Sequence, residues 1–334
     1  MTLEELKPLD DPEWDSSIAK YGSKQVFHER AWLRFVAQSQ NAQVRGARLV
    51  GGEGATIGYL ASGEVRKGPF RLLGSPLQGW TTPAIGPAAD EVPASFPAAL
   101  ESYCRELDVD YVEISNPILS EPVMLAAGFS VDADQTFRVP IGSEPDMWAR
   151  LSSECRNRIR RGTRNGLHVV AVTDRTFVET YYAQLRDVFA RQRLVPTYGI
   201  DRVASLWDAL MPAGRLLALR VERDGEALAS GLFPFDDRAL FFWGGAAWTR
   251  AYASCPNELL HWGAMRFAAE RAIPVYDMSG VSRFKAKFGG TATVTRRWYK
   301  ALTPLARLAR PGYRQYVRTR QRLLGRWRQL TVSS

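Results

Sequence analysis

The chain of 334 residues has room for about two ordinary domains. Hydrophobic residues make up 46% of it and charged residues 24%, which is typical of a folded globular protein and excludes a disordered one. No run of about eighteen apolar residues occurs, and the acidic start at 1–7 lacks the apolar segment of a secretory signal. We therefore expect a cytoplasmic protein.

The net charge of +9 is unevenly placed. Eleven lysines and arginines and no acidic residue lie from Arg296 onward, so the preceding residues carry a net charge of −2. A one-sided basic cluster of this kind favours a polyphosphate partner or an anionic membrane surface.

The three cysteines, Cys104, Cys155 and Cys255, are far apart, odd in number and not accompanied by histidines at ligand spacing. This pattern argues against a disulfide framework and against a zinc site. We expect buried free thiols, no metal and no cofactor.

In the first half, helical spacing of apolar residues predicts helices over 24–40 and 93–107. Short apolar or alternating runs predict strands over 47–50, 56–62, 70–73, 109–115 and 128–141. Residues 73–87 are too rich in glycine and proline for regular structure. A long loop inside a compact domain is often functional.

The second half opens with a predicted helix over 147–163 that carries many arginines, which suit either a solvated face or contact with phosphate. Further helices are predicted over 176–191 and 201–211, the latter with Asp201 as N-cap. A strand meander over 216–222, 227–235 and 240–243 precedes a predicted helix over 256–270.

Landmarks recur in the two halves at an offset of roughly 165 residues, which predicts the duplication of one domain. Asp110–Ser115 corresponds to Pro274–Ser279, for example, and each copy reads as strand meander, helix, strand and closing strand. We expect a first domain over 1–144, a second over 145–308 and a basic amphipathic helix over 309–334.

The most informative stretch is Val275–Gly290, where an apolar strand ends in a glycine-containing turn followed by Lys285, Lys287 and a double glycine. A loop at a strand end exposes backbone N–H groups, the lysines supply mobile cations, and the glycines let a backbone or a ligand come close.

This stretch resembles the closing signature of the FemABX aminoacyltransferases, similar to F-D-x-x-G…F-K-x-x-F-G-G. Ser152, Arg156, Ile159, Arg160 and Gly166 are similar to the segment that opens the second domain in that family. The resemblance implies an α+β fold of two tandem domains of the GNAT acetyltransferase type. It also implies transfer of an aminoacyl group from aminoacyl-tRNA to a peptide amine.

The resemblance implies that Lys285 lies near the reactive end of the donor, where its charge would stabilise an oxyanion or a phosphate. Asp277 and Glu258 are the nearby candidate bases, and Lys285 and Asp277 form the expected catalytic pair. The expected donor-binding residues are Arg283, Phe284, Lys287, Phe288, Gly289, Gly290, Arg156, Arg160, Asn257 and Glu258. The expected acceptor-binding residues are Ser75, Gln78, Trp80 and Tyr198; Ser75 lies in a loop similar to one beside the family's acceptor groove.

Three functions remain open at this point. The first is transfer of an amino acid from aminoacyl-tRNA to a cell-wall precursor or a peptide natural product, by a monomer. The second is acyl-CoA-dependent N-acylation in polysaccharide or lipid assembly, although no Q/R-x-x-G-x-G/A phosphate loop precedes Pro256. The third is binding of nucleic acid or membrane without catalysis. The predicted tail helix would dock on the second domain, bind tRNA phosphates or rest on anionic lipid.

Overall fold

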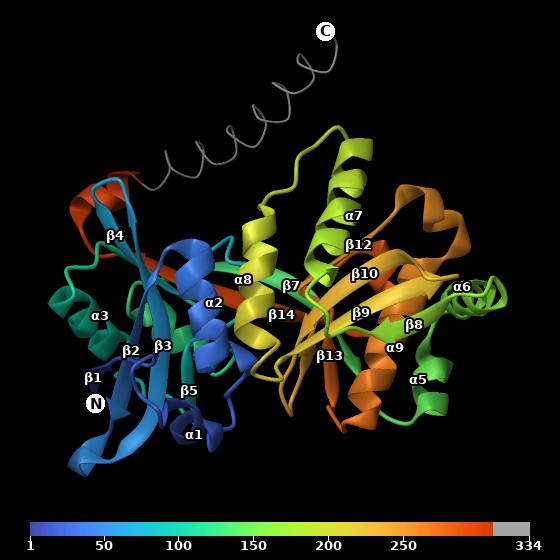
Figure 1. Cartoon of the computed structure of the whole chain (residues 1–334). Coiled ribbons are helices and arrows are strands. Elements are labelled where there is room, and N and C mark those ends of the chain that lie inside the picture. The colour runs from blue at the N-terminus through green and yellow to red at the C-terminus, as the bar shows by residue number, and fades with distance from the viewer. Residues whose placement is uncertain (310–334) are drawn as a thin grey trace, which may run out of the picture. The chain divides into compact units, whose positions relative to one another are not determined.

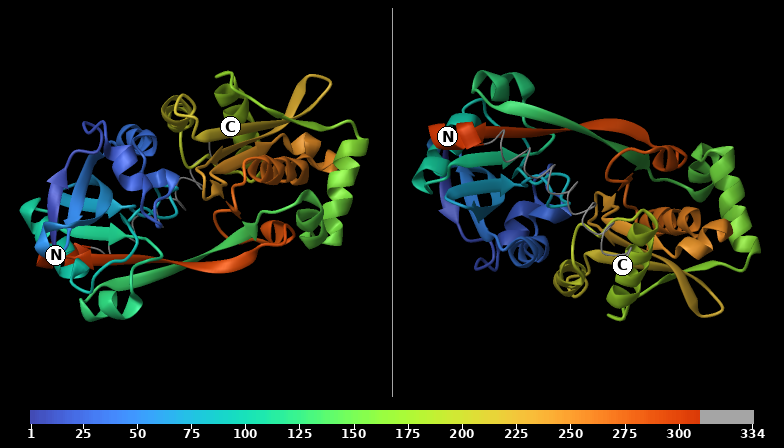
Figure 2. Two further views of the ribbon diagram at one scale, coloured as in Figure 1. Left: turned by 90° about the horizontal axis from the view of Figure 1, so that it is seen from below. Right: turned by 90° about the horizontal axis from the view of Figure 1, so that it is seen from above.

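The computed structural model describes residues 1–309, which form two compact units (Figure 1). Unit 1 comprises residues 1–134 and 294–309, and unit 2 comprises residues 135–293. The chain passes from unit 1 to unit 2 within strand β7 (Ser130–Pro140) and returns within strand β14 (Thr291–Ala301), both long strands in Figure 2.

Unit 1 is built on a sheet in which the strands follow the order β1-β2-β3-β4-β6-β14. Neighbouring strands are antiparallel except for the parallel pair β4–β6. The strands are β1 (Thr2–Leu6), β2 (Gln43–Val50), β3 (Thr56–Lys67), β4 (Phe70–Ser75), β5 (Pro87–Ala89), which pairs with β3, and β6 (Tyr111–Ile114). The helices are α1 (Trp14–Ala19), η1 (Val26–His28), η2 (Gly52–Gly54), α2 (Arg30–Gln40), α3 (Phe96–Glu106) and α4 (Glu121–Ala126).

Apolar spacing explains the helices of unit 1. In α2, Ala31, Trp32, Phe35 and Val36 are buried along one face, which is the pattern of an amphipathic helix packed on a core. The predicted helix over 24–40 is therefore confirmed from Arg30 onward, whereas its first residues form η1.

Unit 2 has two sheets. One is antiparallel with the strand order β12-β10-β9-β8, and helix α9 packs along β9 and β10 (Figure 1). The other contains β7, β13 and β11, with β7–β13 antiparallel and β13–β11 parallel. The strands are β8 (His168–Ala171), β9 (Leu216–Arg223), β10 (Glu226–Pro234), β11 (Leu240–Phe241), β12 (Gly244–Ala247) and β13 (Val275–Asp277). The helices are α5 (Glu144–Arg150), α6 (Ser153–Arg164), α7 (Phe177–Arg191), α8 (Ile200–Leu210), η3 (Thr249–Ser254), α9 (Pro256–Glu270) and α10 (Arg283–Ala286).

The mixed α/β class and the repeated order of elements are confirmed. Each unit has an antiparallel hairpin, β2–β3 or β9–β10, followed by a parallel pair, β4–β6 or β11–β13. A helix, α3 or α9, precedes the second strand of each parallel pair.

The closing strands are exchanged between the two copies. Residues 138–140 of β7, at the end of the first copy, pair with β13 in unit 2. Residues 298–301 of β14, at the end of the second copy, pair with β6 in unit 1. The units therefore differ from the domains expected from the sequence: residues 135–144 lie in unit 2 and 294–308 in unit 1, because strand pairing places them there.

Two helix predictions need correction. The helix expected over 147–163 is two helices, α5 and α6, because the chain turns at Leu151 and the Ser152 hydroxyl caps α6 by accepting from the Cys155 N–H at 3.1 Å. The N-cap of α8 is Gly199, and Asp201 lies within its first turn.

The expected basic helix over 309–334 lies, from residue 310 onward, outside the described residues. Across residues 1–309, no helix is long and apolar enough to cross a membrane. The expected burial of all three cysteines as free thiols is confirmed, and burial raises the pKa of Cys104 and Cys155 to about 12.

The returning strand β14 should be essential to the stability of unit 1. The Trp298 side chain is fully buried in the core of that unit. Trp298→Ala should therefore lower the free energy of unfolding by about 3–5 kcal/mol, measured by chemical denaturation. Val294 on the same strand is 44% exposed, so Val294→Ala is the matched control and should change it little. Equal effects of the two substitutions would contradict this role for β14.

Candidate active site

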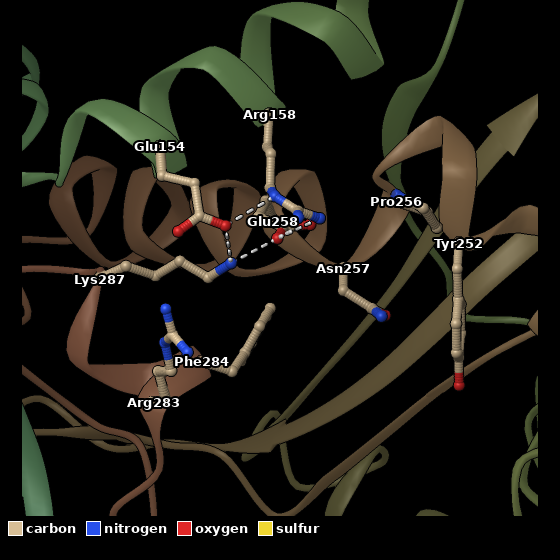
Figure 3. Close-up of a pocket in the computed structure, with 9 residues that line it drawn as sticks. All are labelled: Glu154, Arg158, Tyr252, Pro256, Asn257, Glu258, Arg283, Phe284 and Lys287. Carbon is tan, nitrogen blue, oxygen red and sulfur yellow. Dashed lines mark hydrogen bonds and ion pairs between the residues drawn. The ribbon is translucent and has the colours of Figure 1, made fainter.

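A cavity of about 490 Å³ opens in unit 2 where three elements meet (Figure 3). Helix α6 contributes Glu154 and Arg158, and the segment around α10 contributes Arg283, Phe284 and Lys287. The end of η3 and the start of α9 contribute Tyr252, Pro256, Asn257 and Glu258. The cavity thus combines predicted donor-binding residues with others that the sequence did not single out.

Charges of both signs line the cavity. Lys287 Nζ lies 2.7 Å from Glu258 Oε1 and 3.6 Å from Glu154 Oε1. Arg158 contacts the same two carboxylates, Glu154 at 3.0 Å and Glu258 at 3.6 Å (Figure 3). Glu258 is only 3% exposed, so its charge is compensated by these two cations. The charge of Lys287 lowers the pKa of Glu154, and the charge of Glu258 raises the pKa of Arg158.

Helix α9 begins at the cavity in an unusual way. Its N-cap, Cys255, has a left-handed backbone with φ of 62°, and Pro256 occupies the first turn. Proline has no N–H, and the carboxylate of Glu258 lies at this helix end, where the helix dipole favours negative charge. The helix start is therefore already supplied with an anion from its own sequence.

Asp277 ends strand β13 and does not line the cavity. Its Oδ1 accepts hydrogen bonds from the Thr136 hydroxyl at 2.6 Å and from the Ser279 N–H at 2.8 Å. Arg138 lies 3.8 Å from its Oδ2. These contacts hold the turn after the strand, where Ser279 and Gly280 have positive φ. This arrangement favours a positioning role for Asp277 over the expected role in proton transfer.

Lys285 lies at the fork where β11 and β13 separate. The two strands pair as far as Phe241 of β11 and Asp277 of β13. After β11 the chain continues into β12, which pairs with β10 in the other sheet. Lys285 Nζ donates to the Ser279 carbonyl at 2.8 Å and lies 5.5 Å from the centre of the Phe242 ring. Burial lowers the pKa of Lys285, while the charge of Asp277 opposes this shift. Lys285 therefore faces the fork and Lys287 faces the cavity.

The rest of the signature packs inside unit 2. Phe288 is fully buried. Gly289 has φ of +76°, and a Cβ there would lie 2.6 Å from the Arg150 carbonyl oxygen. A Cβ on Gly290 would lie 3.0 Å from the Val139 side chain. These glycines permit close packing of the backbone. Phe288, Gly289 and Gly290 therefore have a packing role inside unit 2 in place of the expected direct contact with the donor.

The two arginines expected to bind the donor do not line the cavity. Arg156 donates to the carbonyls of Leu151 at 2.6 Å and Ala149 at 3.2 Å, at the end of α5. Arg160 lies over the Trp148 ring. Arg158, between them in sequence, lines the cavity instead, and its spacing of four residues from Glu154 is the signal that could have identified it.

The expected acceptor residues are divided between the units and are mostly structural. In unit 1, Ser75 is buried, donates to the Ala61 carbonyl and accepts from the Gly86 N–H at 2.9 Å. Trp80 is buried against Gly63, whereas the Gln78 side chain is exposed. Tyr198 lies in unit 2 with its hydroxyl 3.0 Å from that of Tyr181. Glu113, which accepts from the Gln78 N–H at 2.6 Å, was not anticipated.

His261, on α9, is buried beneath the signature segment. Its Nδ1 lies 2.6 Å from the Tyr276 hydroxyl, and this hydrogen bond joins α9 to β13. Burial lowers the pKa of His261 to about 3, and the charges of Lys285 and Lys287 lower it further. His261 is therefore neutral at physiological pH.

In the part of the chain that the structure describes, no group of histidine, cysteine, aspartate and glutamate side chains could hold a metal ion.

Residues 149–287 match a family model described as an acetyltransferase (GNAT) domain. The fold is similar to that of FemX, with a TM-score of 0.69 and 14% identity over 88% of this chain and 96% of that one. It is also similar to the C-terminal domain of a putative lysylphosphatidylglycerol synthetase from Agrobacterium fabrum, with a TM-score of 0.54 and 14% identity over 89% and 93% of the chains. A tandem GNAT protein from the clavulanic acid biosynthesis pathway gives a TM-score of 0.50 and 10% identity over 90% and 98%. No curated protein sequence matches this chain significantly.

Two buried histidines should make stability depend on pH. Burial lowers the pKa of His28 to about 4 and that of His261 to about 3, so the unfolded chain binds protons from about pH 6.5 downward that the folded chain does not. The free energy of unfolding should therefore fall by about 2 kcal/mol between pH 6 and pH 5, measured by chemical denaturation.

The double variant His261→Phe, Tyr276→Phe removes one of these histidines and its hydrogen-bond partner together. It should keep about half of that pH dependence, because His28 remains. Replacement of the exposed His168 by glutamine is the control and should leave the dependence unchanged. A double variant with the full pH dependence of the wild type would contradict a neutral buried His261.

Proposed function

We propose that the chain is a FemABX-like aminoacyltransferase of the GNAT superfamily, because residues 149–287 match a GNAT domain model and the fold is similar to that of FemX. It moves an amino acid from aminoacyl-tRNA to the amine of a peptide, either a cell-wall precursor or a peptide natural product. The observation that carries this proposal is the cavity at the start of α9, with its charges of both signs.

An aminoacyl-tRNA end presents the phosphate of its terminal nucleotide close to the reactive ester. Arg158, Arg283 and Lys287 supply cations for this phosphate. Glu154 and Glu258 hold the side chains of Arg158 and Lys287 in place through ion pairs.

The start of α9 disfavours acyl-CoA as the donor. A pyrophosphate at a helix start is held by successive backbone N–H groups and by the positive end of the helix dipole. Here Pro256 lacks an N–H, and the carboxylate of Glu258 already lies at this end. A pyrophosphate held by this helix start would lose a hydrogen bond and bring two negative charges toward the Glu258 carboxylate, whereas a single phosphodiester held by cationic side chains needs no N–H of the helix start.

The chemistry takes place at the fork beside Lys285. The neutral acceptor amine attacks the ester carbonyl carbon, a C–N bond forms, the C–O bond to the ribose breaks, and the amine proton leaves on the ribose oxygen. The Lys285 ammonium stabilises the oxyanion that develops between these steps. Asp277 holds the Ser279 turn, whose carbonyl in turn holds Lys285 Nζ.

Acceptor binding is assigned to the exposed Gln78 side chain and to the partly buried Tyr198. Ser75 and Trp80 support the 73–87 loop from within and are not proposed to touch the acceptor.

A donor screen on the purified chain tests the proposal. tRNA charged with labelled amino acids and acyl-CoA thioesters are each offered with a peptide carrying a free amine. We expect label to move from tRNA to the peptide and the transfer to stop after RNase treatment. Transfer from acyl-CoA that RNase does not affect would overturn the proposal. Affinity for RNA without turnover of either donor would instead indicate a binding protein.

Lys285→Ala should lower kcat by about 10²–10³, because it removes the cation at the fork. Single-turnover assays with saturating donor measure the chemical step. The matched control is Lys67→Ala, since Lys67 is an exposed lysine on β3 of unit 1. Full activity of Lys285→Ala would remove Lys285 from the catalytic step.

A further inference from the structure

Helix α6 carries more positive charge than its packing requires. Five arginines and one glutamate lie within its twelve residues. Its buried face is formed by Cys155, Ile159 and Gly162, which leaves most of the arginines to the other sides of the helix.

Three of these arginines form a row that begins at the cavity. Arg158 lines the cavity, and Arg161 and Arg164 follow at intervals of three residues (Figure 3 shows Arg158). Side chains at this spacing are neighbours on one helix surface, with Cβ atoms about 5–6 Å apart. The row therefore leads away from the cavity along the helix.

The outer arginines of the row have no carboxylate partner. Arg161 and Arg164 are exposed, and neither forms an ion pair within residues 1–309. Two other exposed arginines of unit 2 do have carboxylate partners: Arg175 lies 2.8 Å from Asp208, and Arg250 pairs with Glu226. The charges of Arg161 and Arg164 thus stay available to a ligand.

A fourth arginine joins the row from another element. Arg223 lies at the end of β9, and its side chain approaches Gly166, just after α6, to within 3.9 Å of a Cβ built there. Its side chain is 43% exposed, and its Nε lies 4.0 Å from a carboxylate oxygen of Asp224, a side chain that is 94% exposed. Cations in the last turn of a helix interact favourably with the helix dipole, which explains why Arg161 and Arg164 lie at the end of α6. The dipole does not explain Arg223, because this residue belongs to β9.

We propose that Arg161, Arg164 and Arg223 contact successive backbone phosphates of the donor RNA whose terminal phosphate occupies the cavity. This inference rests on the proposed function. A polyanion with evenly spaced charges fits a row of exposed arginines, whose forked donors match phosphate oxygens. The contacts are to the backbone, so they bind RNA without reading its sequence.

The test compares Arg161→Gln, Arg164→Gln in the full chain with the wild type. Fluorescence anisotropy with uncharged tRNA measures affinity across a salt series, which needs no turnover. We expect affinity to fall roughly tenfold and the slope of log K against log salt to decrease by about two, one for each lost phosphate contact. The kcat/KM preference for aminoacyl-tRNA over an aminoacylated trinucleotide should fall by a similar factor.

The matched control is Arg66→Gln, Arg186→Gln, which removes two exposed arginines that form no ion pair within residues 1–309, one from β3 and one from α7, and should retain the wild-type affinity for tRNA. Unchanged tRNA affinity and salt slope in the α6 variant would overturn the proposal. A variant whose melting temperature falls while both quantities stay unchanged would overturn it as well, because the arginines would then have only a structural role. Loss of binding to phosphatidylglycerol vesicles with tRNA affinity retained would overturn it in favour of a membrane surface. If tRNA affinity falls but charged tRNA is no donor, the surface assignment stands and the proposed function fails.

Discussion

The buried carboxylate of Glu258 is the constraint around which the candidate site is arranged. A carboxylate that is 3% exposed is costly unless cations and hydrogen bonds compensate it. Its two cations come from different elements, Arg158 from α6 and Lys287 from the segment after α10. The charge on α9 therefore fixes the positions of both neighbouring elements, and the cavity is the space that remains between them.

A second, uncharged connection lies one helical turn further along α9. His261 is hydrogen-bonded to Tyr276 on β13 and surrounded by the rings of Phe242, Phe284 and Phe288. Phe284 belongs to α10 and packs against His261 and Phe288, so these contacts hold α10 against α9. Lys285 and Lys287 are thus directed to opposite sides, one toward the fork and one toward the cavity.

Local patterns were predicted well from the sequence and tertiary relations were not. The bounds of α9 were predicted from the proline at its start and from its apolar spacing. Asn257, Glu258 and Lys287 were predicted to lie in one site, and all three line the cavity. Which arginine of α6 faces the cavity could not be read from a family pattern, because it depends on the break at Leu151 that sets the helix phase. The burial of Ser75 and Trp80 depends on strands distant in sequence, so a loop rich in glycine and proline was taken to be a binding loop.

The exchange of closing strands has a consequence for how this chain is synthesised and for how it evolved. The sheet of unit 1 lacks the β14 segment next to β6 until residue 301 has left the ribosome, by which time all of unit 2 has been made. The interior unit can thus mature before the unit that begins the chain. Each copy now supplies the closing strand of the other, β7 to unit 2 and β14 to unit 1. Loss of one copy, or its transfer to another gene, would therefore leave the remaining copy without its closing strand.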